Sequence, residues 1–165
     1  MNNAQVGIAR EKARRLLKEL KVTEPPVRLA PFIKHLGITT APHTIDDKLS
    51  GATGFDPESN ESYIIYNENH HVHRQRFTVA HELGHVAFDH TNYKEDNPDF
   101  HSKDDAEIEA NQFAAELLMP LTMLKADVSR LGTVKKLAFR YWVSEEAMTW
   151  RLMDTNLFKK LQSWN

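Results

Sequence analysis

The chain has 165 residues, 41% of them hydrophobic and 27% charged, with a formal net charge of −2 at pH 7. This length fits one compact domain, or one domain with a small appendage, and the near-neutral charge excludes a chain that binds nucleic acid through its overall charge. The sequence has no cysteine, so disulfides and thiolate zinc sites are excluded and any metal must be held by His, Asp or Glu.

The first part of the chain is predicted to form two helices and a small sheet. Apolar residues recur with a helical period over residues 4–21 and 27–36, and Gly37 is well placed to end the second helix. A strand is expected at residues 38–41, and an antiparallel pair of strands at residues 52–55 and 62–67. No apolar run reaches 18 residues and no signal segment precedes the first helix, so we expect a cytoplasmic protein without a membrane-spanning segment.

The apolar run at residues 77–88 is predicted to be a buried helix that carries the motif His81-Glu82-Leu83-Gly84-His85. Residues four apart lie about 40° apart around a helix axis, so the two imidazoles project from one face, one turn apart. Glu82 lies on the flank of that face, where it can touch a water on a metal without being a ligand. Two imidazoles and an adjacent carboxylate are what a zinc peptidase needs. Because such residues are costly to bury without partners, ordinary surface histidines are the less favoured interpretation.

Three more histidines, His70, His71 and His73, lie just before this helix. They could form a second metal site. Histidines in loops are more often solvated, so we do not expect one.

The second half of the chain is predicted to be helical. A polar segment at residues 92–105 is expected to be a loop, and a third helix with an apolar stripe then runs up to Pro120. Three short helices are expected at residues 121–131, 134–141 and 144–153. We therefore divide the chain into a metallopeptidase-like core over residues 1–120 and a small helix-turn-helix-like tail packed on it over residues 121–165.

A catalytic zinc usually takes three protein ligands and leaves one position for water, so one ligand is needed beside the two histidines. The third helix offers Glu107, Glu109 and Glu116. At about 100° per residue, Glu109 and Glu107 lie at opposite edges of the apolar face, and Glu116 lies about two turns beyond Glu109. Spacing favours Glu109 over Glu107 only slightly, and each carboxylate could instead be solvated.

Two segments together carry a family resemblance. Residues 77–85 (Phe-Thr-Val-Ala-His-Glu-Leu-Gly-His) and 109–120 (Glu-Ala-Asn-Gln-Phe-Ala-Ala-Glu-Leu-Leu-Met-Pro) resemble the ImmA/IrrE family of metallopeptidases. The similarity extends over most of residues 27–155. One departure is visible, because many relatives carry His four residues after the second motif histidine, where this chain has Asp89 followed by His90.

The resemblance implies an α+β, zincin-like fold with a small antiparallel sheet and one Zn²⁺ per chain. It places the third ligand in the Glu-Ala-Asn-x-Phe-Ala segment, on Glu109, beside His81 and His85, with Glu82 as the catalytic base. Family members include proteases of phages and mobile elements that cleave or inactivate helix-turn-helix repressors, and a regulator of the radiation response. The resemblance therefore suggests a helix-turn-helix repressor as protein substrate.

The helical tail is the part of the chain that could contact DNA. From residue 121 onward, eight basic and four acidic residues give it a charge of about +4, which is mild. Its last predicted helix opens with Glu145 and Glu146, a poor surface for phosphates or base edges. The sequence favours a packing or substrate-docking role over DNA binding.

The leading interpretation is a zinc-dependent endopeptidase that cleaves a protein substrate. The alternative is a non-cleaving antirepressor, or a toxin–antitoxin component, that binds its partner on the same fold. The intact motif argues against lost chemistry, because a binding module has no need of Glu82. The residue that helps to stabilise the oxyanion stays open among Tyr66, His90, His101 and Tyr141.

Overall fold

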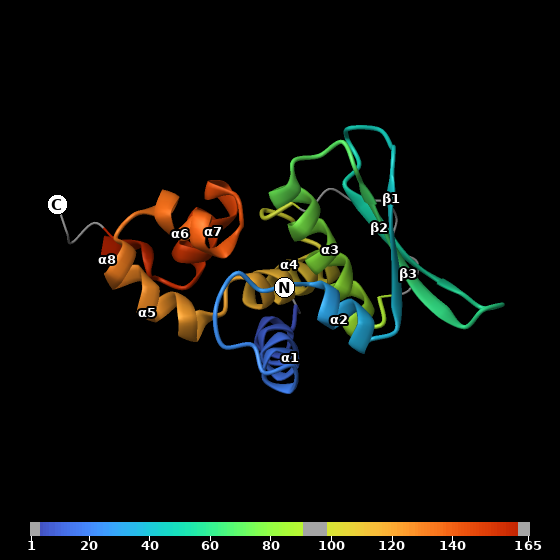
Figure 1. Ribbon diagram of the computed structural model, residues 1–165, viewed down its shortest axis with the longest axis horizontal. Coiled ribbons are helices and arrows are strands. Elements are labelled where there is room, and N and C mark those ends of the chain that lie inside the picture. The colour runs from blue at the N-terminus through green and yellow to red at the C-terminus, as the bar shows by residue number, and fades with distance from the viewer. Residues whose placement is uncertain (1–3, 91–98, 162–165) are drawn as a thin grey trace.

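The computed structural model describes residues 4–90 and 99–161, which form an α+β fold with eight helices and one three-stranded sheet (Figure 1). The helices are α1 (Val6–Glu19), α2 (Ala30–His35), α3 (Val72–Ala87), α4 (Asp105–Leu118), α5 (Leu121–Leu131), α6 (Val134–Tyr141), α7 (Glu145–Asp154) and α8 (Phe158–Leu161). The strands are β1 (Ile38–His43), β2 (Gly51–Asp56) and β3 (Glu61–Asn67).

The predicted α+β fold class is confirmed, and most elements lie where their patterns placed them. α2 is shorter than predicted, but Gly37 does follow its end, with a φ of +65° that glycine adopts without strain. α3 begins earlier than predicted, at Val72, after His71 caps its first turn. The predicted loop over residues 92–105 lies partly outside the described residues, and α8 had no prediction.

The sheet has the strand order β1-β3-β2, with β3 in the centre. β2 and β3 are antiparallel, as predicted, and β1 pairs with β3 in parallel, so the complete sheet is mixed. β1 and β3 run in the same direction because the chain reverses once between β1 and β2 and once more between β2 and β3.

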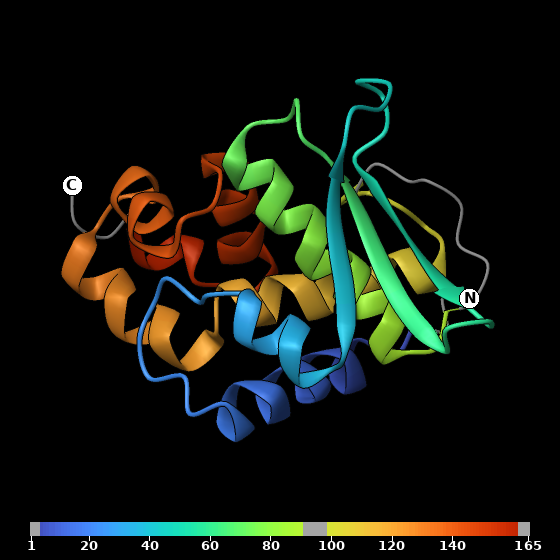
Figure 2. The ribbon, with the colours of Figure 1, turned by 45° about the vertical axis from the view of Figure 1, so that its right-hand side comes forward.

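Helices α3 and α4 pack against each other at the centre of the molecule, and the sheet lies across one side of α3 (Figures 1 and 2). α1 packs on α4. Gly84 makes the contact between α3 and α4 close, because a Cβ at this position would lie only 2.8 Å from Ala110 Cα. The motif histidines are therefore held within side-chain reach of α4.

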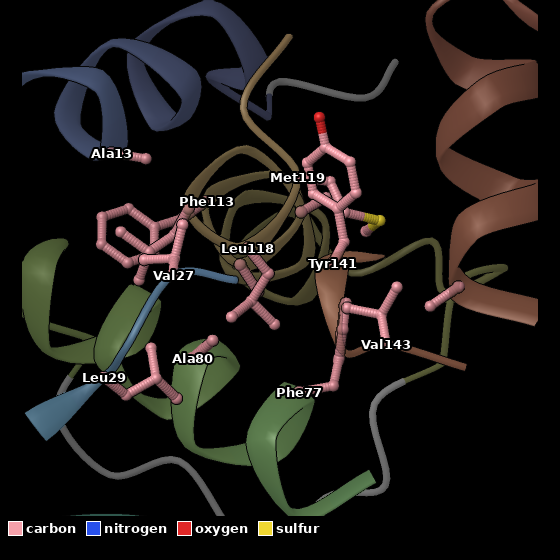
Figure 3. Packing of buried hydrophobic residues seen from close by; sticks show 14 of the residues in the cluster. Ala13, Val27, Leu29, Phe77, Ala80, Phe113, Leu118, Met119, Tyr141 and Val143 are labelled. Atoms are coloured by element: carbon pink, nitrogen blue, oxygen red, sulfur yellow. The ribbon is translucent and has the colours of Figure 1, made fainter. Parts of the chain in front are cut away.

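The hydrophobic core is one continuous cluster that joins the N-terminal and C-terminal helices (Figure 3). Ala80 of α3 and Phe113 and Leu118 of α4 are buried in it, together with Tyr141 of α6 and Val143 of the loop between α6 and α7. Pro120 lies at the junction between α4 and α5, and the described part of the tail shares the core of the preceding residues. The division of the chain at residue 120 stays a prediction.

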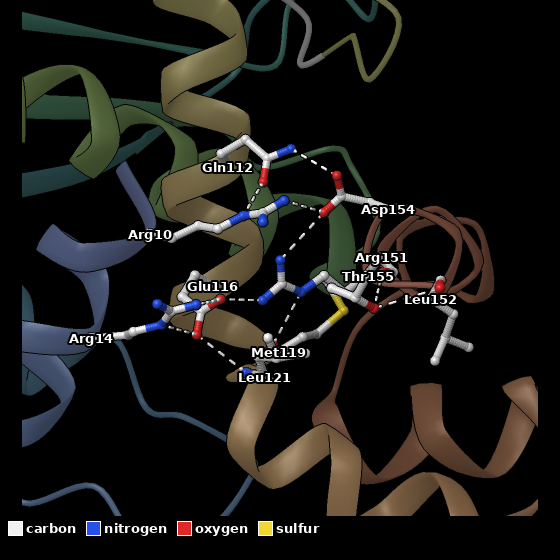
Figure 4. A network of polar contacts seen from close by, with 10 residues as sticks. All are labelled: Arg10, Arg14, Gln112, Glu116, Met119, Leu121, Arg151, Leu152, Asp154 and Thr155. Carbon is white, nitrogen blue, oxygen red and sulfur yellow. Dashed lines mark hydrogen bonds and ion pairs between the residues drawn. The ribbon is translucent and has the colours of Figure 1, made fainter. Parts of the chain in front are cut away.

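A partly buried network of polar side chains connects α1, α4 and α7 (Figure 4). Arg151 of α7 is fully buried and forms an ion pair with Glu116 of α4, which also accepts a hydrogen bond from Arg14 of α1 at 3.0 Å. Arg10 of α1 contacts Asp154 of α7 at 2.8 Å. Because each charge has a partner, burial in this network is tolerated.

Among the residues that the structure describes, no helix is both long and apolar enough to cross a membrane. The longest, α3, has 16 residues and carries the polar motif side chains.

Candidate metal centre

Helix α3 presents the two motif histidines on one buried face. His81 and His85 are 0% and 1% exposed, and their Nε2 atoms lie 3.0 Å apart. A helical separation of four residues places the rings one above the other, as the sequence predicts. Both rings thus offer the same nitrogen to one point between α3 and α4.

Glu107, not Glu109, is the carboxylate that meets the two histidines. Its Oε2 lies 3.2 Å from His81 Nε2 and its Oε1 lies 3.2 Å from His85 Nε2. His81, His85 and Glu107 are the residues within the described ranges whose ligand atoms converge in a group able to hold a metal ion. The structure therefore does not bring Glu109, the expected third ligand, together with the histidine pair in this group.

Burial raises the pKa of the Glu107 carboxyl, but the closeness of His81 and His85 outweighs this effect and lowers its pKa to about 2. Glu107 is therefore ionised at neutral pH. Its Oε1 is buried and receives no well-directed hydrogen bond from the described residues, although His85 Nε2 is 3.2 Å away. A buried carboxylate oxygen in this condition is costly unless a cation satisfies it.

The donor set fits a zinc ion. His81 Nδ1 lies 3.0 Å from Asn111 Oδ1, while Asn111 Nδ2 donates to the backbone carbonyl of Asp99 at 2.9 Å. An amide oxygen only accepts, so His81 carries its proton on Nδ1 and directs the lone pair of Nε2 toward Glu107. Ligand atoms at about 2.0–2.2 Å around a tetrahedral Zn²⁺ would be about 3.3–3.6 Å apart, a few tenths of an ångström longer than the 3.0–3.2 Å separations found here.

Glu82 follows His81 on α3 and is 3% exposed. About 100° of helical rotation separates it from His81. Its role as a base that flanks the metal ligands stays a prediction.

Glu109 has different partners. Its Oε1 accepts a hydrogen bond from the backbone N–H of Gln5 at 2.7 Å, and its Oε2 lies 3.1 Å from His90 Nε2. Burial, followed by the neighbouring His85, lowers the pKa of His90 despite the opposing effect of Glu109. Glu109 thus lies beside the site, behind His90.

An open groove of about 490 Å³ reaches His85 of the histidine pair. Its walls come from β2, β3 and the end of α3, and include Phe55, Tyr63, His85 and His90. Phe55 and Tyr63 are 52% and 42% exposed. The groove therefore joins an apolar surface on the sheet to the candidate metal centre.

The other histidines near the start of α3 have contacts of their own. His71 Nδ1 accepts from the backbone N–H of His73, and His70 Nε2 lies 3.0 Å from the carbonyl oxygen of Asp47. These contacts cap α3 and order the loop before it. His70, His71 and His73 belong to no group of potential ligands found in residues 4–90 and 99–161.

Two of the four oxyanion candidates are placed by clear contacts. The Tyr141 hydroxyl donates to Asp127 at 2.9 Å, within the C-terminal helices, whereas His90 Nδ1 lies 3.0 Å from His85 Nδ1. His101 lines a second cavity beside the start of α3, and Tyr66 lies in the central strand. His90 therefore lies next to the histidine pair, whereas Tyr141 is bonded to Asp127 in the C-terminal helices.

The sequence alone does not single out Glu107 as the third carboxylate. A helical wheel assumes one apolar stripe, whereas nearly all of α4 from Glu107 to Leu118 is buried. A helix buried on every side has no single inner face, so distance from an apolar stripe cannot rank its carboxylates. No spacing in the sequence predicts the contact of Asn111 with His81.

Comparisons with known proteins find a matching family and two similar proteins. The model of the IrrE N-terminal-like domain, peptidase family M78, matches residues 33–153. Uncharacterized immunity region protein 2 of Bacillus phage phi105 is 31% identical over 122 residues, which are 72% of this chain and 73% of that protein. A solved structure of a Mycobacterium tuberculosis transcriptional regulator is similar with a TM-score of 0.65 at 18% identity, over 92% of this chain and 47% of the other.

This chain thus spans about half the length of that regulator, and the likeness to it is one of fold. The family match includes the α3 motif, α4 and the helices up to α7. Since it covers well over half of the sequence, the chain belongs to the ImmA/IrrE family, peptidase family M78.

Proposed function

We propose that this chain is a zinc-dependent endopeptidase that cleaves a protein substrate. The observation that carries the proposal is the convergence of His81 Nε2, His85 Nε2 and the ionised Glu107 at one buried point, beside Glu82. Membership of a peptidase family supports it. In this proposal Glu107 replaces Glu109 as the third zinc ligand.

Each residue has a chemical task in this proposal. His81, His85 and Glu107 would hold one Zn²⁺, which when bound supplies a Lewis acid and lowers the pKa of water in the site. Glu82 accepts a proton from the attacking water and then delivers it to the leaving amine. Glu82 is buried and directly follows His81 on α3, which supports its assignment to this site.

The groove beside β2 gives a substrate its path to the site. β2 is an edge strand, since its one neighbour in the strand order is β3. An extended peptide can pair with the backbone of such an edge, with its side chains set in neighbouring pockets. Phe55 and Tyr63 then offer apolar contacts, and His85 lines the same groove. This arrangement suits an unfolded or exposed segment of a protein.

The substrate class we propose is a helix-turn-helix transcriptional repressor. Two comparisons support this choice, because one relative is named as a phage immunity region protein and one structural neighbour as a transcriptional regulator. We do not assign DNA binding to the α6–α7 pair, because the first turn of α7 carries the exposed acids Glu145 and Glu146.

The test compares wild type with Glu82→Gln on helix-turn-helix repressors encoded in the same genetic neighbourhood. Mass spectrometry should detect repressor fragments with wild type and a loss of at least about 10²-fold in cleavage rate with Glu82→Gln. Both proteins should retain zinc, since Glu82 is a base and not a ligand. The cleavage assay is repeated in cells after DNA damage, because the activity of a protease that cleaves a repressor would need to be controlled.

The alternative, an antirepressor that binds without cleavage, gives a different result. Wild type and Glu82→Gln would then both relieve repression and neither would produce fragments. That outcome would exclude the peptidase. His81→Ala serves as the control for the metal, because it should lose zinc and cleavage together.

A further inference from the structure

The chain reverses direction at the end of α3 and returns His90 to His85. Phe88 is the C-cap of α3, and Asp89 follows with a φ of +52°, in the left-handed region. The backbone N–H of His90 donates to the carbonyl of His85 at 3.0 Å, and that of Asp89 donates to Val86 at 3.1 Å. This pair of bonds is a Schellman motif, which places the second residue after the helix against the helix's last turn.

The reversal creates a hydrogen-bonded series that begins at a proposed zinc ligand. His85 Nδ1 lies 3.0 Å from His90 Nδ1, and His90 Nε2 lies 3.1 Å from Glu109 Oε2. The other oxygen of Glu109 accepts the N–H of Gln5, at the start of α1. His90 also stacks on Phe88, with ring centroids 5.3 Å apart. The side chains of His90 and Glu109 are only 15% and 7% exposed.

The acceptor at the end of the series fixes the protons along it. A carboxylate only accepts, so His90 carries a proton on Nε2 and, as a neutral ring, accepts at Nδ1. His85 must then donate from its own Nδ1, which leaves the lone pair of its Nε2 directed at Glu107 and His81. This is the tautomer that a zinc ligand needs.

We propose that His90 and Glu109 are positioning residues that hold His85 in the tautomer and orientation required to bind the metal. The proposal rests on the zinc site of the proposed function. It gives Glu109 a role different from that of a ligand, and it mirrors the contact of Asn111 with His81. Each metal-facing imidazole then has one partner for its other nitrogen.

The test measures zinc affinity by competition with a chromophoric chelator, and the visible spectrum of the Co²⁺-loaded protein. His90→Phe keeps a ring against Phe88 but cannot accept from His85, and should weaken zinc binding about 10–100-fold. His90→Asn puts an amide oxygen near the position of Nδ1. On a logarithmic scale, its zinc affinity should therefore lie closer to that of wild type than to that of His90→Phe. The Co²⁺ spectrum should shift in His90→Phe and move back in His90→Asn.

A double-mutant cycle separates a positioning role of Glu109 from direct ligation. Glu109→Ala should weaken zinc binding in wild type but add little loss in the His90→Phe background, because it acts through His90. An equal loss in both backgrounds would show that Glu109 binds the metal by itself, and would overturn the proposal. Should His90→Phe not fold, as judged by circular dichroism, an unshifted Co²⁺ spectrum in Glu109→Ala would overturn it as well.

His81→Ala separates a failure of this inference from a failure of the proposed function. If His81→Ala still binds zinc as wild type does, the metal site itself is misassigned. If His81→Ala loses zinc while folded His90→Phe binds it with wild-type affinity, the site stands and the positioning role falls.

Discussion

The close contact between α3 and α4 can be tested by adding one methyl group, in Gly84→Ala. A Cβ at residue 84 would lie 2.8 Å from Ala110 Cα and 3.3 Å from Ala110 Cβ. Since carbon atoms prefer about 3.5–4.0 Å, the helices must separate by about 1 Å. Ala110 lies three residues after Glu107 on the same face of α4, so the separation moves this carboxylate away from the histidines.

Two opposing terms set the effect of Gly84→Ala on stability. Overpacking costs about 1–3 kcal/mol, whereas alanine in a helix gains about 1 kcal/mol over glycine. The net loss is about 0–2 kcal/mol, or up to about 8 °C in Tm for a chain of this size. Zinc sites tolerate only about 0.2 Å in ligand distances, so zinc affinity should fall more clearly, by at least about 10-fold.

Urea denaturation of the zinc-free protein and chelator competition measure these two effects separately. Gly7→Ala is the matched control, because a Cβ at residue 7 of α1 would meet nothing within 4 Å. It should leave zinc affinity unchanged and stability equal or higher by up to about 1 kcal/mol. If Gly84→Ala binds zinc as tightly as Gly7→Ala, the close contact is not what holds Glu107 in place.

Two further substitutions test the packing around the site. Glu116→Ala leaves the fully buried Arg151 without its ion-pair partner at Glu116. This loss should lower the free energy of unfolding by about 3–5 kcal/mol and Tm by roughly 6–20 °C. Arg15→Ala removes one partner of an exposed pair and should change stability by no more than about 1 kcal/mol. In thermal unfolding, equal Tm values for these two variants would contradict the buried network. Burial raises the pKa of Asp127, but hydrogen bonds from Arg130, Arg140 and Tyr141 outweigh this and leave it lowered. A carboxyl whose pKa is lower in the folded state stabilises the folded protein at pH values above its unfolded pKa of about 3.9. In urea titrations, the free energy of unfolding of wild type should therefore exceed that of Asp127→Asn by a constant amount near neutral pH, and by less as the pH falls below about 4. A difference that grows in acid would refute the assignment.

Local patterns in the sequence were enough to predict most elements of this fold. Helices α1, α5, α6 and α7 follow the apolar period, and Ser144 caps α7 by accepting from the N–H of Ala147, as its position predicts. The parallel pairing of β1 with β3 could not be predicted, because the residues of β1 do not show which edge of β3 this strand joins.

The candidate site could also be predicted only in part. The spacing of His81 and His85 is a property of one helix, so the sequence alone predicts that both rings lie on one face. The third carboxylate comes from another helix, and its choice depends on how α4 lies on α3, which Gly84 controls. The spacing of residues within each helix does not show how α3 and α4 pack on each other. The partner of Glu109 is His90, which reaches it only through the reversal at Asp89.

The most direct test of the metal centre is anomalous diffraction at the zinc edge from crystals of the zinc-loaded protein. The account predicts one peak per chain, within about 2.0–2.2 Å of the Nε2 atoms of His81 and His85 and of a Glu107 oxygen. Glu109 should remain bonded to His90 in the same crystals. A peak coordinated by Glu109, or zinc-loaded crystals with no peak between the two motif histidines, would contradict it.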